Sequence, residues 1–394
     1  MAIEGPRALR KGELRSGVEL ADRVFRVGWD SSMEGDYPVV FCEDNLEGLR
    51  VFVDEGKVIS LVGMVESPIC LLGTSHRGCC IGAVCTEPDY RGQGLATRLL
   101  IDAREKALAD GVDIFAITGG RGLYRRQGYV DVGGYHVCTI ERSRLPSTSR
   151  GIILKKEGYV LRPWRVEDVP ALVRIRSAEP VRFVRTPEDF LTILSSGNVS
   201  NRTGETRVVC KKGSDVPVAY VSYHIGGAPR QDKDPNAVTV MEVGGPRWAI
   251  VQALGRLMDE GGLDDVTLHY LDCDAEMVQM VGSFGWRSEP RGFLGTAGII
   301  DPARFWQACA PLVREMLGHE RSERLGLSAD GSVTVTYGDE ALVLDGMSAF
   351  TRLVFLPQHR RGELELGLPG DSELAGVLDE VFPLPLMDYG LDYI

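Results

Sequence analysis

The sequence predicts a mixed α/β protein with more than one domain. Its 394 residues are too many for one ordinary domain. Short apolar runs typical of strands alternate with amphipathic stretches typical of helices. One block of strand, turn, helix and strand occurs twice: Val84 aligns with Val243 and Gly128 with Gly285, with a short net deletion between the two positions in the second copy. Internal duplication is the economical explanation, and a chance match of two α/β units is the alternative.

The pattern divides the chain into three parts, 1–145, 150–298 and 300–394, with the polar segment 142–151 as the first linker. The first part is expected to contain, in chain order, a helix in 13–29, two strands in 48–65, a strand in 77–88, a helix in 93–109, a strand in 111–118, a short helix in 121–127 and a final strand in 135–141. The second part repeats this order in 238–289. The third is expected to contain a helix in 301–317, a hairpin in 331–345 and helices in 346–355 and 371–381.

Charge and cysteine content narrow the class of protein. The net charge is −12, and residues 321–394 hold five arginines, no lysine and thirteen acidic residues. An acidic surface argues against nucleic-acid or membrane partners and is compatible with a cationic partner, although simple solubility is the plainer explanation. We find no apolar run of membrane-span length and no secretory signal, which favours a cytoplasmic location. Nine cysteines without a C-x-x-C pair indicate reduced thiols, and no metal site is expected.

The stretch "AVCTEPDYRGQGLATRLL" (83–100) places a glycine loop between a strand and a helix. Gly92 and Gly94 permit backbone conformations and close approaches that a side chain would forbid. The amides at the start of the following helix are unpaired and lie at the positive end of its dipole. Together with Arg91 they suit a pyrophosphate. The alternative is that the loop is only a turn.

The loop does not stand alone. The pattern R-x-x-G-x-A after "AVCTEP", followed by "GLYRRQGYV" (122–130), resembles the GCN5-related N-acetyltransferase (GNAT) superfamily. The resemblance extends from the N-terminal region to the strand in 135–141 and implies that acetyl-CoA binds here as co-substrate. It implies that the strand from Gly82 to Thr86 splays from its neighbour and pairs with the pantetheine arm, and that the loop holds the pyrophosphate. The cofactor contacts carried over are Val84, Cys85, Thr86, Arg91, Gly92, Gln93, Gly94, Leu95, Ala96 and Thr97.

Acetyl transfer to an amine requires a polarised carbonyl, an unprotonated amine and a proton for the departing thiolate. The resemblance makes Tyr124 the candidate proton donor, and the alternative is that Tyr124 only packs its short helix onto the sheet. Cys85 in principle offers an acetylation site, but the sequence shows nothing that would activate it.

No base for the amine is evident from the residues alone. Segment 27–49 contains six acidic residues and no basic one. The resemblance implies that this segment, which follows the first helix, borders the acceptor pocket. We therefore expect Asp30, Glu34 or Asp36 to contact a cationic acceptor, with Trp29 as a possible wall. A solvated loop is the alternative.

The second block keeps the order of elements but has "GGPRWAIVQA" where the first has "EPDYRGQGLA". Pro246, Arg247 and Trp248 leave no phosphate cradle. We therefore predict that this copy does not bind CoA and serves as scaffold or pocket wall.

An active and a degenerate GNAT domain, followed by a third part with a hairpin and helices, resemble the enhanced intracellular survival family. "LVLDGMSAFTRLVFLP" and "LAGVLDEVFPLPLMDYGLDYI" are similar to its third domain, which is like sterol carrier proteins. The resemblance implies that the C-terminal carboxylate, here that of Ile394, enters the first domain's site as general base while Tyr124 is the acid. It also implies a homo-oligomer, commonly a hexamer. The alternative is that the C-terminus packs on the surface.

The sequence thus predicts an acetyl-CoA-dependent N-acetyltransferase that transfers the acetyl group directly to an amine of a cationic acceptor: an aminoglycoside-like amine, a polyamine or a lysine. A protein lysine acetyltransferase is one alternative. A non-catalytic acyl-CoA- or lipid-binding protein is another.

Overall fold

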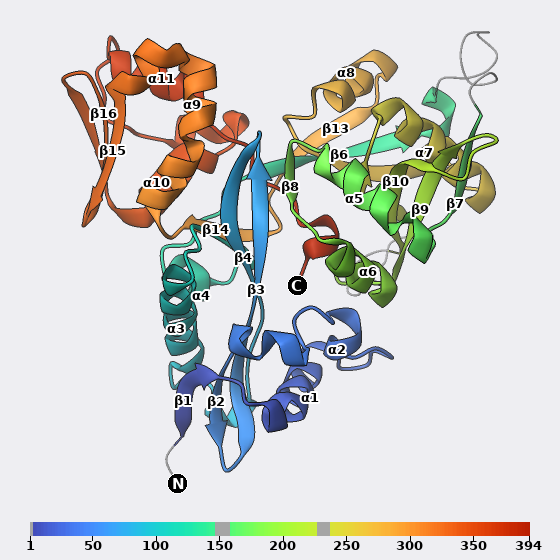
Figure 1. Ribbon diagram of the computed structural model, residues 1–394, viewed down its shortest axis with the longest axis horizontal. Helices are drawn as coiled ribbons and strands as arrows, with labels where there is room; N and C mark the ends of the chain where they lie inside the picture. The colour runs from blue at the N-terminus through green and yellow to red at the C-terminus, as the bar shows by residue number, and fades with distance from the viewer. Residues whose placement is uncertain (1–2, 146–157, 227–236) are drawn as a thin grey trace. The chain divides into compact units, whose positions relative to one another are not determined.

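The computed structural model describes residues 3–145, 158–226 and 237–394, so that residues 146–151 of the expected linker lie outside the described residues. The chain forms two compact units, each discontinuous in sequence (Figure 1). The first contains residues up to Gly133, then Phe293–Met387 and Ile394; the second contains Gly134–Gly292 and Asp388–Tyr393. Mixed sheets flanked by helices confirm the predicted α/β class.

The first unit contains a sheet with the strand order β1-β2-β3-β4-β5-β14. Neighbours in this order are antiparallel except β4 and β5, which are parallel. Its strands are β1 (Glu4–Ala8), β2 (Leu49–Asp54), β3 (Lys57–Leu71), β4 (Thr74–Thr86), β5 (Ile114–Thr118) and β14 (Gly295–Ile299). Its first helices are α1 (Leu14–Phe25), α2 (Met33–Asp36), α3 (Leu95–Ala109) and α4 (Gly122–Arg125).

Helices α1 and α3 lie on opposite faces of this sheet (Figure 1). Successive side chains of a strand point to opposite faces. Leu61 of β3 accordingly contacts α1, where a side chain added at Gly17 would meet it at 3.2 Å, and Val62 packs in the cluster that includes Leu99 of α3. Burial of both faces explains why this strand is a nearly continuous apolar run.

The first unit also contains a three-stranded antiparallel sheet, β15-β16-β17, with its own helices. The elements are α9 (Pro302–Arg324), β15 (Leu325–Asp330), β16 (Ser332–Tyr337), β17 (Glu340–Leu344), α10 (Gly346–Phe355) and α11 (Glu373–Val381). The predicted hairpin and the predicted helices in this region are present. Helix α9 extends beyond the predicted end at 317 through a kink at Gly318, whose φ is +76°.

The second unit contains a sheet with the order β13-β6-β12-β11-β10-β9-β7. Its strands are β6 (Gly134–Glu141), β7 (Tyr159–Pro163), β9 (Gly204–Lys211), β10 (Pro217–Ile225), β11 (Val238–Gly244), β12 (Asp265–Tyr270) and β13 (Arg287–Gly292). The unit also contains the short strand β8 (Val181–Phe183), which is not part of this sheet. Its helices are α5 (Val169–Ser177), α6 (Pro187–Ser196), α7 (Arg247–Gly261) and α8 (Ala275–Phe284).

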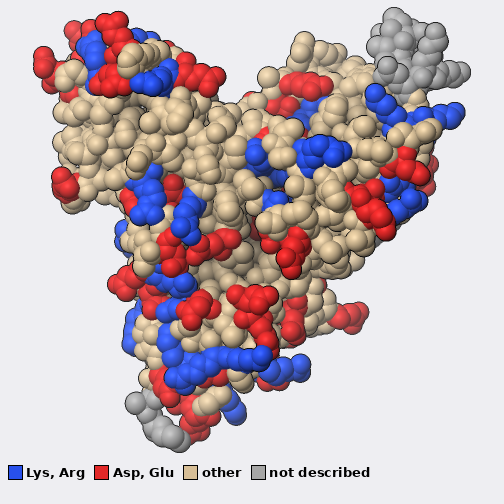
Figure 2. Space-filling view, viewed as in Figure 1, with Lys and Arg blue, Asp and Glu red and all other residues tan. Residues whose placement is uncertain are grey.

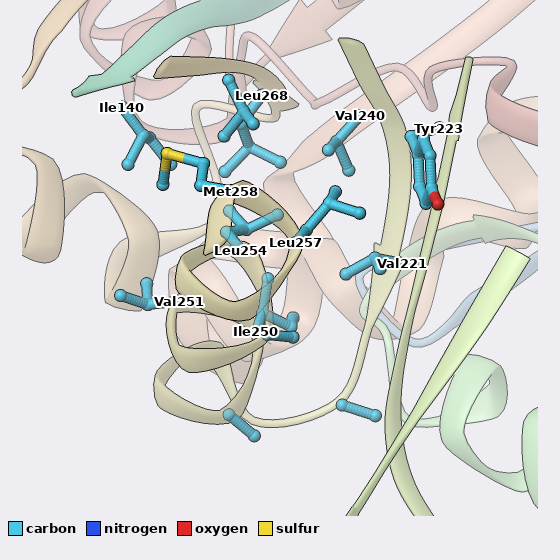
Figure 3. Packing of buried hydrophobic residues seen from close by; sticks show 14 of the residues in the cluster. Ile140, Val221, Tyr223, Val240, Ile250, Val251, Leu254, Leu257, Met258 and Leu268 are labelled. Carbon is cyan, nitrogen blue, oxygen red and sulfur yellow. The ribbon is translucent and has the colours of Figure 1, made fainter. Parts of the chain in front are cut away.

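Strand β6 corrects one prediction. The run 135–141 was expected to close the first block, but β6 lies between β12 and β13 of the second unit's sheet and is antiparallel to both. Ile140 is fully buried in that unit's core, where it packs with Leu268 and Met258 (Figure 3). The place beside β5 is taken instead by β14, which pairs from Gly295 opposite Thr118 onward.

Acidic and basic side chains are interspersed on the face shown in Figure 2. No helix in the three described ranges combines the length and the apolar character that crossing a bilayer requires. Among the described residues, no group of three His, Cys, Asp or Glu side chains is placed to hold a metal ion.

Candidate active site

The site begins where β4 and β5 separate. Their parallel pairing runs from Gly78 to Ile81 of β4, and β4 then continues to Thr86 beside β3 alone. Opposite β3, β4 carries one extra residue between Gly82 and Cys85, and Ala83 there has a φ of +51°. This is a β-bulge, which bends a strand and interrupts its ladder. The last residues of β4 therefore present a backbone edge toward the gap, as an extended ligand would need.

The glycine loop follows directly. Gly92 and Gly94 have φ values of +80° and +74°, in the left-handed region that favours glycine, and a side chain on either would meet nothing within 4 Å. Gly94 is the N-terminal cap of α3, so the first amides of this helix face the same open space. Arg91 Nε donates to the carbonyl oxygen of Thr86 at 3.2 Å. The loop thus combines open space, unpaired amides and a fixed arginine.

A pocket of about 560 Å³ lies along the strand edge and the loop. Nine of the ten predicted cofactor residues line it, and Gln93 does not. The other lining residues, which the sequence analysis did not assign to it, are Val24, Tyr90, Arg121, Leu123 and Arg126.

Three arginines give the pocket its charge. Arg91, Arg121 and Arg126 are exposed, and none forms an ion pair with a described residue. Arg121 Nη1 lies 3.4 Å from the carbonyl oxygen of Val84. Three uncompensated positive charges suit a ligand with several phosphates. Arg121 and Arg126 belong to the stretch "RGLYRRQ" (121–127), in which the sequence predicts a functional role for Tyr124 alone.

Cys85 lines the pocket but is a poor nucleophile. Its side chain is buried on the sheet, and burial raises the pKa of its thiol to about 12. A thiol reacts as the thiolate, which is scarce at neutral pH under these conditions. The geometry therefore favours direct transfer over an acetylated cysteine.

Tyr124 and Ile394 both lie at the end of β5. Ile394 O accepts a hydrogen bond of 2.5 Å from Thr118 Oγ1, and a side chain added at Gly82 would lie 2.5 Å from the same oxygen. Gly119 is the next residue after Thr118, and a Cβ added to it would lie 3.7 Å from the Tyr124 ring. Both side chains are almost fully buried. Gly82 and Thr118 thus form a seat for Ile394 that the sequence analysis missed.

The residues before Ile394 belong to the second unit. There Arg185 forms buried hydrogen bonds with the carboxylates of Glu242 and Asp392. The amide of Leu391 donates to Glu242 at 3.0 Å, and Tyr220 Oη donates to Glu242 at 2.7 Å. Burial raises the pKa of Asp392, whereas nearby arginines hold the pKa of Glu242 below its usual range. This part of the chain is therefore a buried, hydrogen-bonded element of its unit, unlike a loose terminus.

The predicted acceptor residues form a separate group that does not line the cofactor pocket. Asp30 and Glu34 are exposed. Asp36 accepts a hydrogen bond from Arg26 Nε at 2.7 Å, and the Arg26 guanidinium lies 4.9 Å from the centre of the Trp29 ring. Segment 27–49 has no basic residue of its own, but Arg26 immediately precedes it and neutralises Asp36. Asp30 and Glu34 remain open to a ligand.

The corresponding loop of the second unit holds a carboxylate of the protein itself. Glu179 accepts hydrogen bonds from the Gly245 amide at 2.9 Å and from Arg247 Nη1 at 2.8 Å. Arg247 Nε also donates to Asp274 at 2.6 Å. Strands β11 and β12 pair over only two positions, Thr239 with Thr267 and Val240 with Leu268. The separation of the two strands is thus retained, while an internal ion pair occupies the loop.

Known proteins resemble this arrangement. Residues 6–131 match the family described as acetyltransferase (GNAT) domain. The aminoglycoside 2'-N-acetyltransferase of Mycolicibacterium fortuitum is 30% identical over 103 residues, which are 25% of this chain. The match spans about half of that protein, 52% of its length.

Two solved structures share the fold over nearly the whole chain. The GCN5-related N-acetyltransferase from Anabaena variabilis has a TM-score of 0.64 at 14% identity and covers 97% of this chain and 98% of its own. Eis1 from Mycobacterium abscessus has a TM-score of 0.62 at 13% identity and covers 98% and 99%. Residues 6–131 of this chain are therefore an acetyltransferase (GNAT) domain, and GNAT domains use acetyl-CoA as their co-substrate.

Proposed function

We propose that this protein is an acetyl-CoA-dependent N-acetyltransferase that moves the acetyl group directly to an amine of a cationic acceptor. The observation that carries the proposal is the pocket along β4 and the loop, whose lining includes three arginines that form no ion pair with a described residue. In this proposal the loop amides and arginines bind the phosphates, and the free edge of Val84 to Thr86 binds the pantetheine arm.

The acid and the base are assigned at the end of β5. Acetyl-CoA supplies an activated thioester carbonyl, which the amine nitrogen attacks. The Ile394 carboxylate, held by Thr118 Oγ1, removes the proton that the amine must lose. The C–S bond then breaks, and Tyr124 Oη gives its proton to the thiolate. The assignment of the base is supported by the close approach of Ile394 O to Gly82, where an added Cβ would lie 2.5 Å from this oxygen. The intact mass of the protein establishes whether Ile394 carries a free carboxylate.

The proposed acceptor is a small cationic amine. Asp30 and Glu34 are exposed and form no ion pair with a described residue, so their carboxylates are available to the ammonium group of the acceptor. Trp29 and Asp36, which is neutralised by Arg26, lie in the same segment. The match to an aminoglycoside acetyltransferase favours an aminoglycoside-like amine over a polyamine or a lysine.

The wider organisation remains a set of predictions from the resemblance. These are the divisions at 1–145, 150–298 and 300–394, a sterol carrier protein-like third domain, a homohexamer and a cytoplasmic location. The Glu179–Arg247 pair supports the scaffold role proposed for the second copy, because it fills the position where a phosphate would bind.

The test is the release of CoA thiol from acetyl-CoA with a panel of aminoglycosides, polyamines and lysine peptides. Release that depends on an aminoglycoside or polyamine and is lost in Tyr124→Phe supports the proposal. Peptides as the best acceptors would indicate a lysine acetyltransferase. Acetyl-CoA binding without release for any amine would leave the alternative, a binding protein.

A further inference from the structure

The second unit contains a pocket that the proposed transfer reaction does not use. It has a volume of about 490 Å³ and lies at the carboxyl ends of β11 and β12, where the two strands separate. All its walls belong to this unit: the end of α5, the start of α7, the β12–α8 connection and residues 388 and 390. It occupies the place in the second sheet that the cofactor pocket occupies in the first.

One end of this pocket is closed to anions. Glu179 and Asp274 hold Arg247 from both sides, with Arg247 Nε 2.6 Å from Asp274. Although burial opposes it, the hydrogen bonds to Glu179 raise the pKa of Arg247, so the guanidinium stays charged and paired. A phosphate entering here would displace an existing carboxylate. The pocket therefore does not take a nucleotide at this end.

The other end presents two atoms without a hydrogen-bond partner among the described residues, His269 Nδ1 and Asp388 Oδ2. The His269 side chain is only 10% exposed, and its Nδ1 has no hydrogen-bond partner among the described residues. The Tyr135 ring stacks on the imidazole, with 4.5 Å between the ring centres, and fixes its plane. Asp388 Oδ2 lies 3.7 Å from Nδ1, too far for a direct hydrogen bond. The other oxygen, Oδ1, accepts from the amide of Tyr389 at 2.8 Å.

A buried acceptor without a donor costs free energy, so this end is built for a group that donates. In the tautomer with its proton on Nε2, His269 Nδ1 accepts. A primary ammonium has three N–H donors and reaches two acceptors 3.7 Å apart at ordinary hydrogen-bond distances of about 2.8 Å. Five carboxylates line the pocket, of which Glu179 and Asp274 are paired with Arg247, and Glu242 with Arg185. Glu276 and Asp388 are the lining carboxylates without an arginine partner among the described residues. The remaining wall of the pocket includes Met241, Val243 and Leu271, which suit an aliphatic chain.

We propose that this pocket is a second binding site, specific for a small aliphatic molecule with a primary ammonium group. The ammonium donates to His269 Nδ1 and to Asp388 Oδ2, and the aliphatic part lies against the apolar wall. The site is separate from the acid and base proposed for acetyl transfer, which lie in the first unit.

The test uses the full-length Tyr124→Phe protein, so that an amine ligand is not consumed. We titrate it calorimetrically with 1,4-diaminobutane and, as the neutral counterpart, with 1,4-butanediol. Adding Asp388→Asn or His269→Gln should weaken diamine binding about tenfold or more, the usual cost of losing a hydrogen bond to a charged group. Asp265→Asn, an exposed substitution on β12 outside the pocket, is the matched control and should change nothing.

The ¹⁵N signal of His269, assigned by its loss in His269→Gln, locates the ligand. It should shift with the diamine and stay unchanged with the diol. Equal shifts of the His269 signal with the diamine and the diol, or a diamine-induced shift that is undiminished in Asp388→Asn, would overturn the proposal, as would the absence of saturable binding. The assay measures binding alone, so its result is independent of whether wild-type protein releases CoA.

Discussion

Replacing Gly82 by alanine tests the seat of Ile394 with a single methyl group. Gly82 lies on β4, which is held by β3 on one side, so the strand resists displacement. The added Cβ would lie 2.5 Å from Ile394 O and 2.6 Å from the carbon that carries this oxygen. Real Cβ contacts essentially never fall below 3.0 Å, and both partners are backbone atoms. Ile394 must therefore move away by several tenths of an ångström.

This displacement sets the size of the effect. Ile394 O receives its hydrogen bond from Thr118 Oγ1 at 2.5 Å, so a shift of the oxygen distorts that bond and misplaces the proposed base. A positioned general base contributes about 10²- to 10⁴-fold to the rate, or roughly 3–5 kcal/mol at 1.36 kcal/mol per decade. We expect kcat to fall within this range in Gly82→Ala. Acetyl-CoA affinity should be nearly unchanged, because the loop and its arginines are untouched.

Steady-state kinetics with acetyl-CoA and the best acceptor, together with a direct CoA binding measurement, check this prediction. Thr118→Val removes the same hydrogen bond from the other side and should act in the same direction, whereas Thr118→Ser keeps the hydroxyl and is the matched control. An unchanged kcat in both Gly82→Ala and Thr118→Val would refute the reasoning. Ile394 would then only pack in the site.

Three further predictions concern other parts of the chain. Tyr124→Phe should lower kcat about 100-fold at constant KM for acetyl-CoA, because it removes only the proposed proton donor; steady-state kinetics measure this. Gly92→Ala imposes a side chain at φ +80°, at a cost of about 1–2 kcal/mol, and should raise the KM for acetyl-CoA about tenfold while sparing kcat at saturation. Burial lowers the pKa of His224 from 6.5 to about 4 in the folded protein. Between pH 6.5 and pH 4 this histidine is therefore protonated in the unfolded chain but not in the folded one, so the free energy of unfolding decreases as the pH falls through this range. Urea unfolding should give a free energy of unfolding about 2 kcal/mol lower at pH 5 than at pH 7.5. The decrease should be absent in His224→Gln and present in His319→Gln, the control, which changes an exposed histidine.

The glycine loop was predictable because its structure is local. Its strand, turn and helix are consecutive, and the positive φ values of Gly92 and Gly94 are a property of the residue type. The same local logic located Tyr124 on a short helix. By contrast, the contact of Gly82 and Thr118 with Ile394 joins residues from opposite ends of the chain, and no local pattern marks it.

Two other features escaped the sequence for physical reasons. Alternation of apolar residues assigns a strand to a face but not to a neighbour, so β6 was predicted in the wrong sheet. The composition of segment 27–49 predicts free carboxylates, but whether a carboxylate is paired depends on its neighbours in space. Arg26, just outside the segment, neutralises Asp36. Asp30 and Glu34, which have no such neighbour in their segment, stay predictions.

Strand β6 pairs in the second sheet, whereas β14, made much later, completes the first. This arrangement constrains the order in which the strands can pair during synthesis. The open edge of β5 has no partner until residues 295–299 have left the ribosome, and β6 waits for β12, which is made much later. A nascent chain that ends just after β6 therefore carries two unsatisfied strand edges, which are sites of aggregation and edge-to-edge pairing. A fragment ending there should be insoluble or should dimerise through β5. The first sheet is therefore completed only after every strand of the second sheet has been made.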